Sequence, residues 1–289
     1  MMGLVLTNAL DSNDMFLHQM HNYTGNVIEK YNYVFYDLGD PRVKNWAPIS
    51  SPLPTLFLIG IYLLLVYVVL PRHMATKNPY SLKTVIYYYN IFQIVACATL
   101  IYKIVTPLTE PSYVIKCEHF SYSLSTRSMK RLTLSYYFYF IKVIELVETL
   151  MFILRKKYNQ VSPLHVYHHV STLALAWFFA RYYAGGLASF SMMLNSSIHV
   201  LMYSYYFISS LGQFWQKKIN KWKPIITVLQ MVQFFILVAH ASQVLFNENC
   251  GLPNLTFYIY GFNIVVNFYM FGKFFKQNYL QSNKGHKKN

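Results

Sequence analysis

The segment Leu53–Leu70 contains no charged residue and constrains the fold more than any other part of the chain. A helix needs about 20 mostly apolar residues to cross the hydrocarbon core of a bilayer, where only its own backbone can satisfy its hydrogen-bonding groups. Composition agrees, because 55% of the 289 residues are hydrophobic and only 12% are charged, too few to cover a water-soluble domain of this size. The chain is therefore predicted to be an all-α, polytopic membrane protein.

Six further segments have a similar length and apolar character, which predicts seven transmembrane helices packed as a bundle. The first span is expected to stop at Pro71 and Arg72. The other six are Leu82–Val105, Leu134–Leu154, Leu164–Tyr182, Leu187–Ser209, Ile225–Phe246 and Asn254–Phe275.

No internal repeat or linker divides the chain. We expect a mobile, lumenal N-terminal arm over residues 1–52, one membrane domain over residues 53–276 and a basic cytosolic tail over residues 277–289. The arm lacks the basic and apolar pattern of a cleavable signal peptide, so it is expected to stay attached.

Positive charge is unevenly divided between the two sets of connections. With a lumenal N-terminus, 15 Lys and Arg residues fall on the inner side and 8 on the outer side. Cytosolic loops carry the excess of basic residues in membrane proteins, so the C-terminus is predicted to be cytosolic. Basic loops at a membrane face account for the net charge of +15, and nucleic acid is not expected as a partner.

Two cysteines and one glycosylation motif fall on the predicted lumenal side. Cys117 lies between the second and third spans, and Cys250 lies between the sixth and seventh. An oxidising compartment would allow these two residues to form a disulfide. Asn22, in the triplet Asn-Tyr-Thr, is the expected glycosylation site.

The third span carries three ionisable residues in its second half. Lys142, Glu145 and Glu148 or its neighbour Thr149 recur at a spacing of three to four residues, which places them on one face of the helix. Ionisable groups in a bilayer are costly and usually face the bundle interior or a water-filled cavity. A Lys–Glu pair alone could simply fix helix packing, whereas the second acid favours a functional site.

Three histidines open the fourth span. Ser162 is expected to cap this helix and Pro163 to occupy its first position, so His165, His168 and His169 lie in the first two turns. Their spacing of i, i+3 and i+4 places them on one face. A single membrane histidine is often a packing residue, but three at this spacing indicate a site.

The fifth and sixth spans add polar residues at helical spacing, although tyrosines alone are more typical of packing. These residues are Asn195, His199, Met202, Tyr203 and Tyr206 in the fifth span and Thr227, Gln230 and Gln233 in the sixth. A rise of 1.5 Å per residue puts the polar groups of four spans roughly 8–14 Å from the cytosolic ends of their helices. They are therefore expected to share one layer, whereas His240 lies deeper and is expected to be structural.

Two kinds of chemistry suit a histidine-rich layer. Neutral imidazole commonly binds zinc or iron, and three histidines on one helix with one from a neighbour could hold a single zinc. An imidazole could instead act as nucleophile or base in acyl transfer, with Asn195 and the glutamines as donors to an oxyanion. The basic rim suits an anionic carrier and the apolar interior suits its chain. A proton-coupled transporter is a further alternative, whereas the seven-helix receptor motifs are absent.

Four motifs resemble those of the ELO family of very-long-chain fatty acid elongases and occur in the family's order between residues 142 and 233. Two departures are Glu148, where the family has aspartate, and Pro163, where it usually has phenylalanine. The HxxHH box matches His165, His168 and His169, and K-x-x-E-x-x-D-T matches Lys142, Glu145 and Thr149. The motifs N-x-x-x-H-x-x-M-Y-x-Y-Y and T-x-x-Q-x-x-Q match Asn195, His199, Met202, Tyr203, Tyr205, Tyr206, Thr227, Gln230 and Gln233.

The resemblance implies a 3-ketoacyl-CoA synthase of the endoplasmic reticulum membrane, which condenses a long-chain acyl-CoA with malonyl-CoA and releases CO2 and CoA. The seven helices would surround a tunnel for the acyl chain. His168 is expected to carry the acyl group, while His165 and His169 orient it and move protons. Asn195 and His199 would stabilise the malonyl-derived enolate, and three residues of the third span would support them: Lys142, Glu145 and Glu148.

Substrate contacts are expected from two sets of residues. The first is Thr149, Met202, Tyr203, Tyr206, Gln230 and Gln233, and the second is the set of rim lysines, Lys156, Lys157, Lys217, Lys218 and Lys221. No metal or cofactor is implied. Other enzymes of the cycle, a ketoreductase, a dehydratase and an enoyl reductase, are expected partners, and a homodimer is compatible with the sequence. The paired lysines of the tail are offset by one from a dilysine retrieval signal, so the compartment rests on the family.

Overall fold

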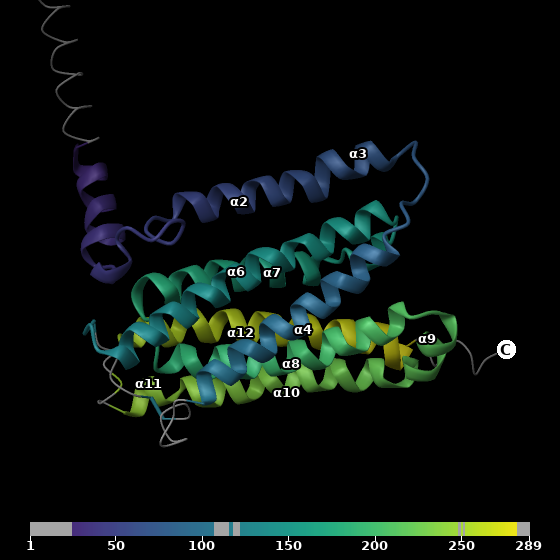
Figure 1. Ribbon diagram of the computed structural model, residues 1–289. Helices are drawn as coiled ribbons and strands as arrows, with labels where there is room; N and C mark the ends of the chain where they lie inside the picture. Colours follow the sequence, from purple (N-terminus) through teal and green to yellow (C-terminus); the bar gives the residue numbers. More distant parts are fainter. Residues whose placement is uncertain (1–24, 107–115, 118–121, 248–249, 251, 282–289) are drawn as a thin grey trace, which may run out of the picture.

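The computed structural model describes residues 25–106, 116–117, 122–247, 250 and 252–281 (Figure 1). Helices dominate these residues, and no strand occurs among them. The expected glycosylation site Asn22 and most of the basic tail lie outside the described residues. The all-α class predicted from the sequence is confirmed.

The long helices follow the predicted apolar segments closely. Their bounds are α2 Leu53–Leu64, α3 Leu70–Met74, α4 Lys83–Val105, α6 Thr126–Leu154, α7 Pro163–Tyr182, α8 Leu187–Ser210, α10 Lys223–Ala241 and α12 Asn254–Phe275. The shorter elements include the π-helices η1 Tyr33–Asp37 and η3 Leu65–Val69, together with α9 Gln213–Ile219, the 3-10 turn η5 Asn220–Trp222 and α11 Gln243–Phe246.

Side-chain caps set the start of two helices that matter for the site. Ser162 accepts a hydrogen bond from the His165 amide at 3.2 Å, and Pro163 occupies the first turn of α7, as predicted. Ser125 accepts from the Ser128 amide at 3.3 Å and starts α6 at Thr126. The apolar pattern of the sequence placed the start of the third span at Leu134. The helix begins eight residues earlier, because its first turns are polar and hydropathy does not detect a polar helix start.

The first predicted span does not stop at Pro71. The helical path continues through α2, η3 and α3 as far as Met74. Pro71 lies in the first turn of α3, directly after the π-helical stretch of η3. A proline is tolerated at that position because the first turn of a helix does not need its amide proton.

Among the residues that the structure describes, four helical stretches are long and apolar enough to cross a membrane: Leu53–Met74, Lys83–Val105, Gln213–Phe246 and Asn254–Gln281. The protein is therefore a multi-pass membrane protein. Helices α6, α7 and α8 stand at the other three predicted positions but carry the polar residues of the motifs, which lowers their hydropathy. Large apolar side chains such as Phe57, Phe235 and Phe262 are exposed on the outer faces, as expected where lipid covers the protein.

Six helices form a closed ring. In order around it, α6 packs on α7, α7 on α12, α12 on α10, α10 on α8, α8 on α4, and α4 back on α6. Helices α2 and α3 lie outside this ring, where α2 packs on α7 and α3 on α6 (Figure 1). The sequence neighbours α7 and α8 thus stand apart, with other helices between them.

The two ends of the bundle differ in what lies there. The histidine end is the end at which α7 begins, with α3 and α9 nearby, and the disulfide end is the opposite end (Figure 1). At the disulfide end Cys117 and Cys250 are bonded, with their Cα atoms 5.2 Å apart. The pairing that the topology allowed therefore occurs in the structure.

The N-terminal arm is anchored at the disulfide end by Arg181, which is fully buried at the end of α7. Its guanidinium donates to the carbonyls of Phe35 and Asp40 at 2.7 and 2.8 Å. Tyr182 donates to the carbonyl of Val34 at 3.0 Å. The arm expected to be mobile is therefore fixed from about residue 33 onward, because a buried cation binds its backbone.

A short link joins α7 to α8 across the disulfide end. It comprises residues 183–186, of which Ala184, Gly185 and Gly186 are buried. Gly185 and Gly186 have φ angles of 120° and 47°, a region that side chains rarely adopt. The glycines let four residues turn the chain beneath the ring and start α8 on the far side from α7.

Candidate active site

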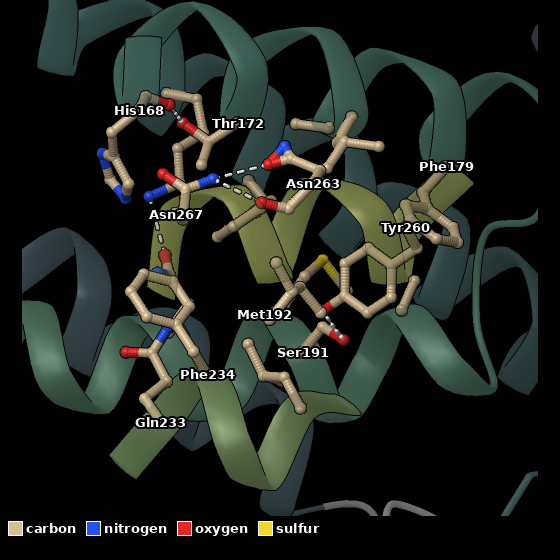
Figure 2. Close-up of a pocket in the computed structure, with 18 of the residues that line it drawn as sticks. His168, Thr172, Phe179, Ser191, Met192, Gln233, Phe234, Tyr260, Asn263 and Asn267 are labelled. Atoms are coloured by element: carbon tan, nitrogen blue, oxygen red, sulfur yellow. Dashed lines mark hydrogen bonds between the residues drawn. The ribbon is translucent and has the colours of Figure 1, made fainter. Parts of the chain in front are cut away.

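A cavity lies inside the ring, and its wall comes from α6, α7, α8, α10 and α12 (Figure 2). Together with the open solvent space at its edge, it comprises about 690 Å³ free of protein atoms. Its apolar lining residues are Phe138, Leu175, Ala176, Phe179, Ala188, Met192, Phe234, Leu237 and Ile264. From His168 to Phe179 the wall follows α7 for about 16 Å at 1.5 Å per residue. The polar residues of the motifs gather at the histidine end of this cavity.

Lys142 is the centre of the first polar cluster. It is 2% exposed, and its Nζ donates to Glu145 Oε1 at 2.8 Å and to Asn195 Oδ1 at 2.7 Å. Glu145 Oε1 also lies 3.0 Å from Nδ1 of His199. The cluster joins α6 to α8. It brings the K-x-x-E-x-x-D-T motif into contact with the motif that contains Asn195 and His199. Lys142 and Asn195 line the cavity as well.

A second polar cluster forms where α6, α7 and α2 meet. Thr149 Oγ1 lies 2.9 Å from His165 Nε2 and 2.8 Å from the hydroxyl of Tyr62, so one threonine links two helices to α6. His169 Nε2 lies 3.9 Å from Glu148 Oε2. The nearest ligand atoms of Glu148, His165 and His169 all lie within 4.8 Å of one another. The metal alternative drawn from the sequence used three histidines of α7 with one from a neighbour, whereas the described residues group two of those histidines with Glu148.

His168 is the histidine of the box that lines the cavity. Its ring packs edge-on against Phe271 of α12, with centroids 6.0 Å apart, and lies 5.5 Å from the ring of His169. Lys142, Asn195 and Gln233 line the same cavity. The three histidines of the box therefore divide into two that contact α6 and one that faces the open space.

The remaining motif residues are distributed unevenly. Gln233 is buried at the cavity wall, whereas Gln230 donates to the sulfur of Met202 at 3.6 Å. Tyr203 is fully buried, and its hydroxyl lies 3.5 Å from that of Tyr89 on α4. The tyrosines of α8, Tyr206 included, pack ring to ring and do not line the cavity. Their position fits best with a packing role, which the sequence alone indicates as the more typical role of such tyrosines.

Rim lysines stand at the histidine end and outside the cavity. Lys217 and Lys218 end α9, and Lys221 lies in the following turn. All three are exposed. Lys156 and Lys157 lie in the connection from α6 to α7, just before the histidine box, where Lys157 is exposed. Positive charge thus surrounds the end of the ring nearest the polar clusters.

Sequence reasoning missed several residues that the structure brings to these clusters. Tyr62 of α2 contacts Thr149. Within α4, Gln93 donates to the hydroxyl of Tyr89 at 3.0 Å, and that hydroxyl lies near Tyr203. Asn263 and Asn267 of α12 line the cavity. A search for amides at i, i+4 within an apolar helix would have found the α12 pair, since amides in a bilayer seldom face lipid.

Comparison with known proteins gives a consistent result. A family model described as the GNS1/SUR4 family, ELO, matches residues 47–287. Very long chain fatty acid elongase 7 of Rattus norvegicus is 38% identical over 221 residues, covering 75% of this chain and 78% of that protein. A very long chain fatty acid elongase of Aedes aegypti is 35% identical over 265 residues, covering 91% of this chain and 70% of the mosquito protein.

A human relative agrees with these two. Very long chain fatty acid elongase 4 of Homo sapiens is 34% identical over 226 residues, covering 78% of this chain and 71% of that protein. The family match covers both polar clusters, the cavity helices and the disulfide. The chain therefore belongs to the ELO family, also described as the GNS1/SUR4 family.

Proposed function

We propose that this protein is a fatty acid elongase that condenses a long-chain acyl-CoA with malonyl-CoA to give 3-ketoacyl-CoA, CO2 and CoA. Its membership of a family whose curated relatives are named very long chain fatty acid elongases supports elongation. The observation that carries the condensation chemistry is the position of His168. This imidazole lies in the wall of an apolar cavity beside a buried Lys–Glu–Asn network.

In the first step a ring nitrogen of His168 attacks the thioester carbonyl of the acyl-CoA. The carbon–sulfur bond breaks, CoA leaves as a thiolate that takes a proton from water, and the acyl group stays on the imidazole as an acyl-imidazolium. The apolar residues that line the cavity, among them Phe138 and Leu237, hold the acyl chain. His165 and His169 are tied to Thr149 and Glu148, which favours a role in orienting the neighbouring imidazole.

In the second step malonyl-CoA loses CO2, and the resulting enolate attacks the acyl carbonyl. The carbon–nitrogen bond breaks, 3-ketoacyl-CoA forms and His168 returns to neutral imidazole. Lys142 and Asn195 form a polar wall that suits stabilisation of the enolate oxygen, and His199 supports this wall through Glu145. Glu145 holds this wall together, since it contacts both Lys142 and His199.

The membrane arrangement belongs to the same proposal. Seven helices cross the membrane of the endoplasmic reticulum, with the N-terminus lumenal and the histidine end facing the cytosol. The cavity serves as the acyl tunnel. Lys156, Lys157, Lys217, Lys218 and Lys221 bind the phosphates of CoA, because they stand at the histidine end and ammonium groups form charge-assisted hydrogen bonds with phosphate. A ketoreductase, a dehydratase and an enoyl reductase act on the product.

The test is release of labelled CO2 from malonyl-CoA by purified protein given a series of long-chain acyl-CoAs. His168→Ala is the variant and His240→Ala the matched control, because His240 is a buried histidine that stacks on Phe190 outside the cavity. We expect release that requires acyl-CoA, survives a chelator and disappears only in His168→Ala. Intact mass after acyl-CoA alone should show an acyl adduct that His168→Ala lacks.

Two outcomes would overturn the proposal. Release that a chelator abolishes and zinc restores would favour a metal held by Glu148, His165 and His169. Folded wild-type protein that binds acyl-CoA without releasing CO2 would exclude condensation and favour the transporter alternative.

A further inference from the structure

The face of α12 that lines the cavity carries two amides that the motifs do not include. Tyr260, Asn263, Ile264 and Asn267 follow one another at i, i+3, i+4 and i+7 along this face. Asn263 is 8% exposed and Asn267 is 2% exposed. Amide side chains inside a membrane helix are costly to bury, so a pair at a cavity wall is a candidate for a functional role.

Contacts within the helix fix which way the Asn267 amide points. Its Nδ2 donates to the backbone carbonyl of Asn263 at 2.9 Å and to Oδ1 of Asn263 at 2.6 Å. Both partners can only accept hydrogen bonds, so the nitrogen of the Asn267 amide must face them and the oxygen must face away. That oxygen, Oδ1, is buried and accepts no hydrogen bond from the described residues.

The free oxygen lies on the same face of α12 as the contact with His168. Phe271, four residues and about one turn after Asn267, packs against the His168 ring. Helices α7 and α12 are neighbours in the ring, and both side chains line the same cavity. Figure 2 shows the Asn267 amide and the His168 ring at the same end of the cavity, with the nitrogen of the amide turned toward Asn263.

A nucleophilic imidazole needs such an acceptor. Neutral imidazole has one N–H and one lone pair, and the partner of the N–H decides which nitrogen is free to react. The His168 ring makes no hydrogen bond within the part of the chain that the structure describes. Ser171 and Thr172 bond only to its backbone carbonyl.

We propose that Asn267 is a positioning residue for the proposed condensation. When acyl-CoA is bound, its Oδ1 accepts a hydrogen bond from the N–H of His168, a bond that neither side chain makes in this structure, and the other ring nitrogen is left to attack the thioester. The inference rests on the proposed function, because it assigns the partner of the proposed nucleophile. The N–H stays on His168 through both steps, since the acyl group adds to and leaves the opposite nitrogen. An amide oxygen suits this role because it stabilises the positive acyl-imidazolium without taking its proton.

The experiment is single-turnover acylation by acyl-CoA alone, followed by quenched-flow and intact mass measurement. Asn267→Leu has a similar size and lacks the acceptor. Asn267→Asp, buried as the neutral acid, can donate its O–H to the Asn263 carbonyl and keep its other oxygen toward His168. Asn90→Leu is the matched control, because it makes the same substitution at a buried amide of α4 that does not line the cavity. We expect Asn267→Leu to slow acylation about 10- to 100-fold, the range for loss of a group that orients a histidine through its second ring nitrogen, with acyl-CoA affinity unchanged.

Asn267→Asp should recover most of the wild-type rate, and Asn90→Leu should retain it. Acylation of Asn267→Leu at the wild-type rate, or equal slowing in Asn267→Leu and Asn267→Asp, would overturn the inference. Should Asn267→Leu fail to fold, Asn267→Ala replaces it, and a wild-type rate there overturns the inference equally. Absence of an acyl adduct on wild-type protein would instead overturn the proposed function, so the two failures are distinguishable.

Discussion

Lys142 and Arg181 are two buried cations with opposite surroundings. Lys142 is 2% exposed and Arg181 is fully buried, so burial does not tell them apart. Lys142 contacts a carboxylate and an amide, and it lines the cavity at the histidine end. Arg181 donates to backbone carbonyls of the N-terminal arm at the disulfide end and takes no part in the cavity wall.

This contrast separates a site from a structural anchor. A guanidinium has several donors in a fixed fork, which suits the carbonyls of an irregular segment. An ammonium is a compact charge that can neutralise a carboxylate and still face an open space. The feature that marks Lys142 as functional is therefore access to the cavity, and neither charge nor depth identifies it alone.

The largest expected effect comes from Lys142→Met. Loss of the cation from the proposed enolate wall should lower the rate of CO2 release by about 10²- to 10³-fold. It also leaves the buried Glu145 without its ion-pair partner, which should lower stability by about 3–5 kcal/mol. The double variant Lys142→Met with Glu145→Leu separates the two effects. We expect the double variant to unfold near the wild-type temperature without recovering CO2 release. A recovered rate would mean that Lys142, like Arg181, has only a structural role.

Arg181→Met should damage stability alone. The carbonyls of Phe35, Tyr36 and Asp40 lose a charged donor, and the free energy of unfolding should fall by about 3–5 kcal/mol. Turnover per folded molecule should not change, because Arg181 lies outside the cavity. Thermal unfolding in detergent and CO2 release by the folded fraction measure both quantities. A large loss of turnover in a variant of unchanged stability would mean that Arg181 is not a purely structural residue.

The disulfide at the same end is a second test of the anchor region. Replacing Cys117 and Cys250 by serine removes a link between residues 133 apart and should lower stability by about 2–4 kcal/mol. Catalysis by the folded protein should again be unaffected. The shift in unfolding temperature should match that of wild-type protein treated with a reductant. A mismatch would mean that the serines disturb packing beyond the loss of the bond.

Ala188→Leu is the smallest change and tests the cavity between the two cations. Ala188 is buried in the cavity wall near the start of α8, remote from the histidines. The added side chain fills space and should cost about 1 kcal/mol of stability through overpacking. Product analysis should show shorter maximum chains and an unchanged rate for short acyl-CoAs. Unchanged chain lengths would mean that substrate does not reach this part of the cavity.

Local signals in the sequence predict much of this fold and site. Apolar length gave the helix positions, and Ser162 with Pro163 gave the start of α7, because capping depends on residues close in the chain. Helical spacing correctly grouped Lys142 with Glu145. The proximity of Glu145 to His199 followed from comparing depths in two helices.

Other features depend on which helices are neighbours, and no local pattern encodes that. The contact of Tyr62 with Thr149 requires α2 to lie against α6, and Asn267 requires the proximity of α12 to α7. Nothing in the sequence marks Arg181 as an anchor, since its partners are backbone carbonyls and any sequence supplies those. The continued helix past Pro71 depends on a π-helical stretch that hydropathy cannot distinguish from ordinary helix.

The buried link of residues 183–186 has a consequence for variation among related chains. Connections usually lie on the surface and accept insertions more readily than helices do. Here the connection is inside the protein, and a side chain at Gly185 would meet Arg131 at 3.0 Å. A scan that inserts single residues through the whole gene should therefore find this connection as intolerant as a helix core. Tags and protease sites would have to go elsewhere.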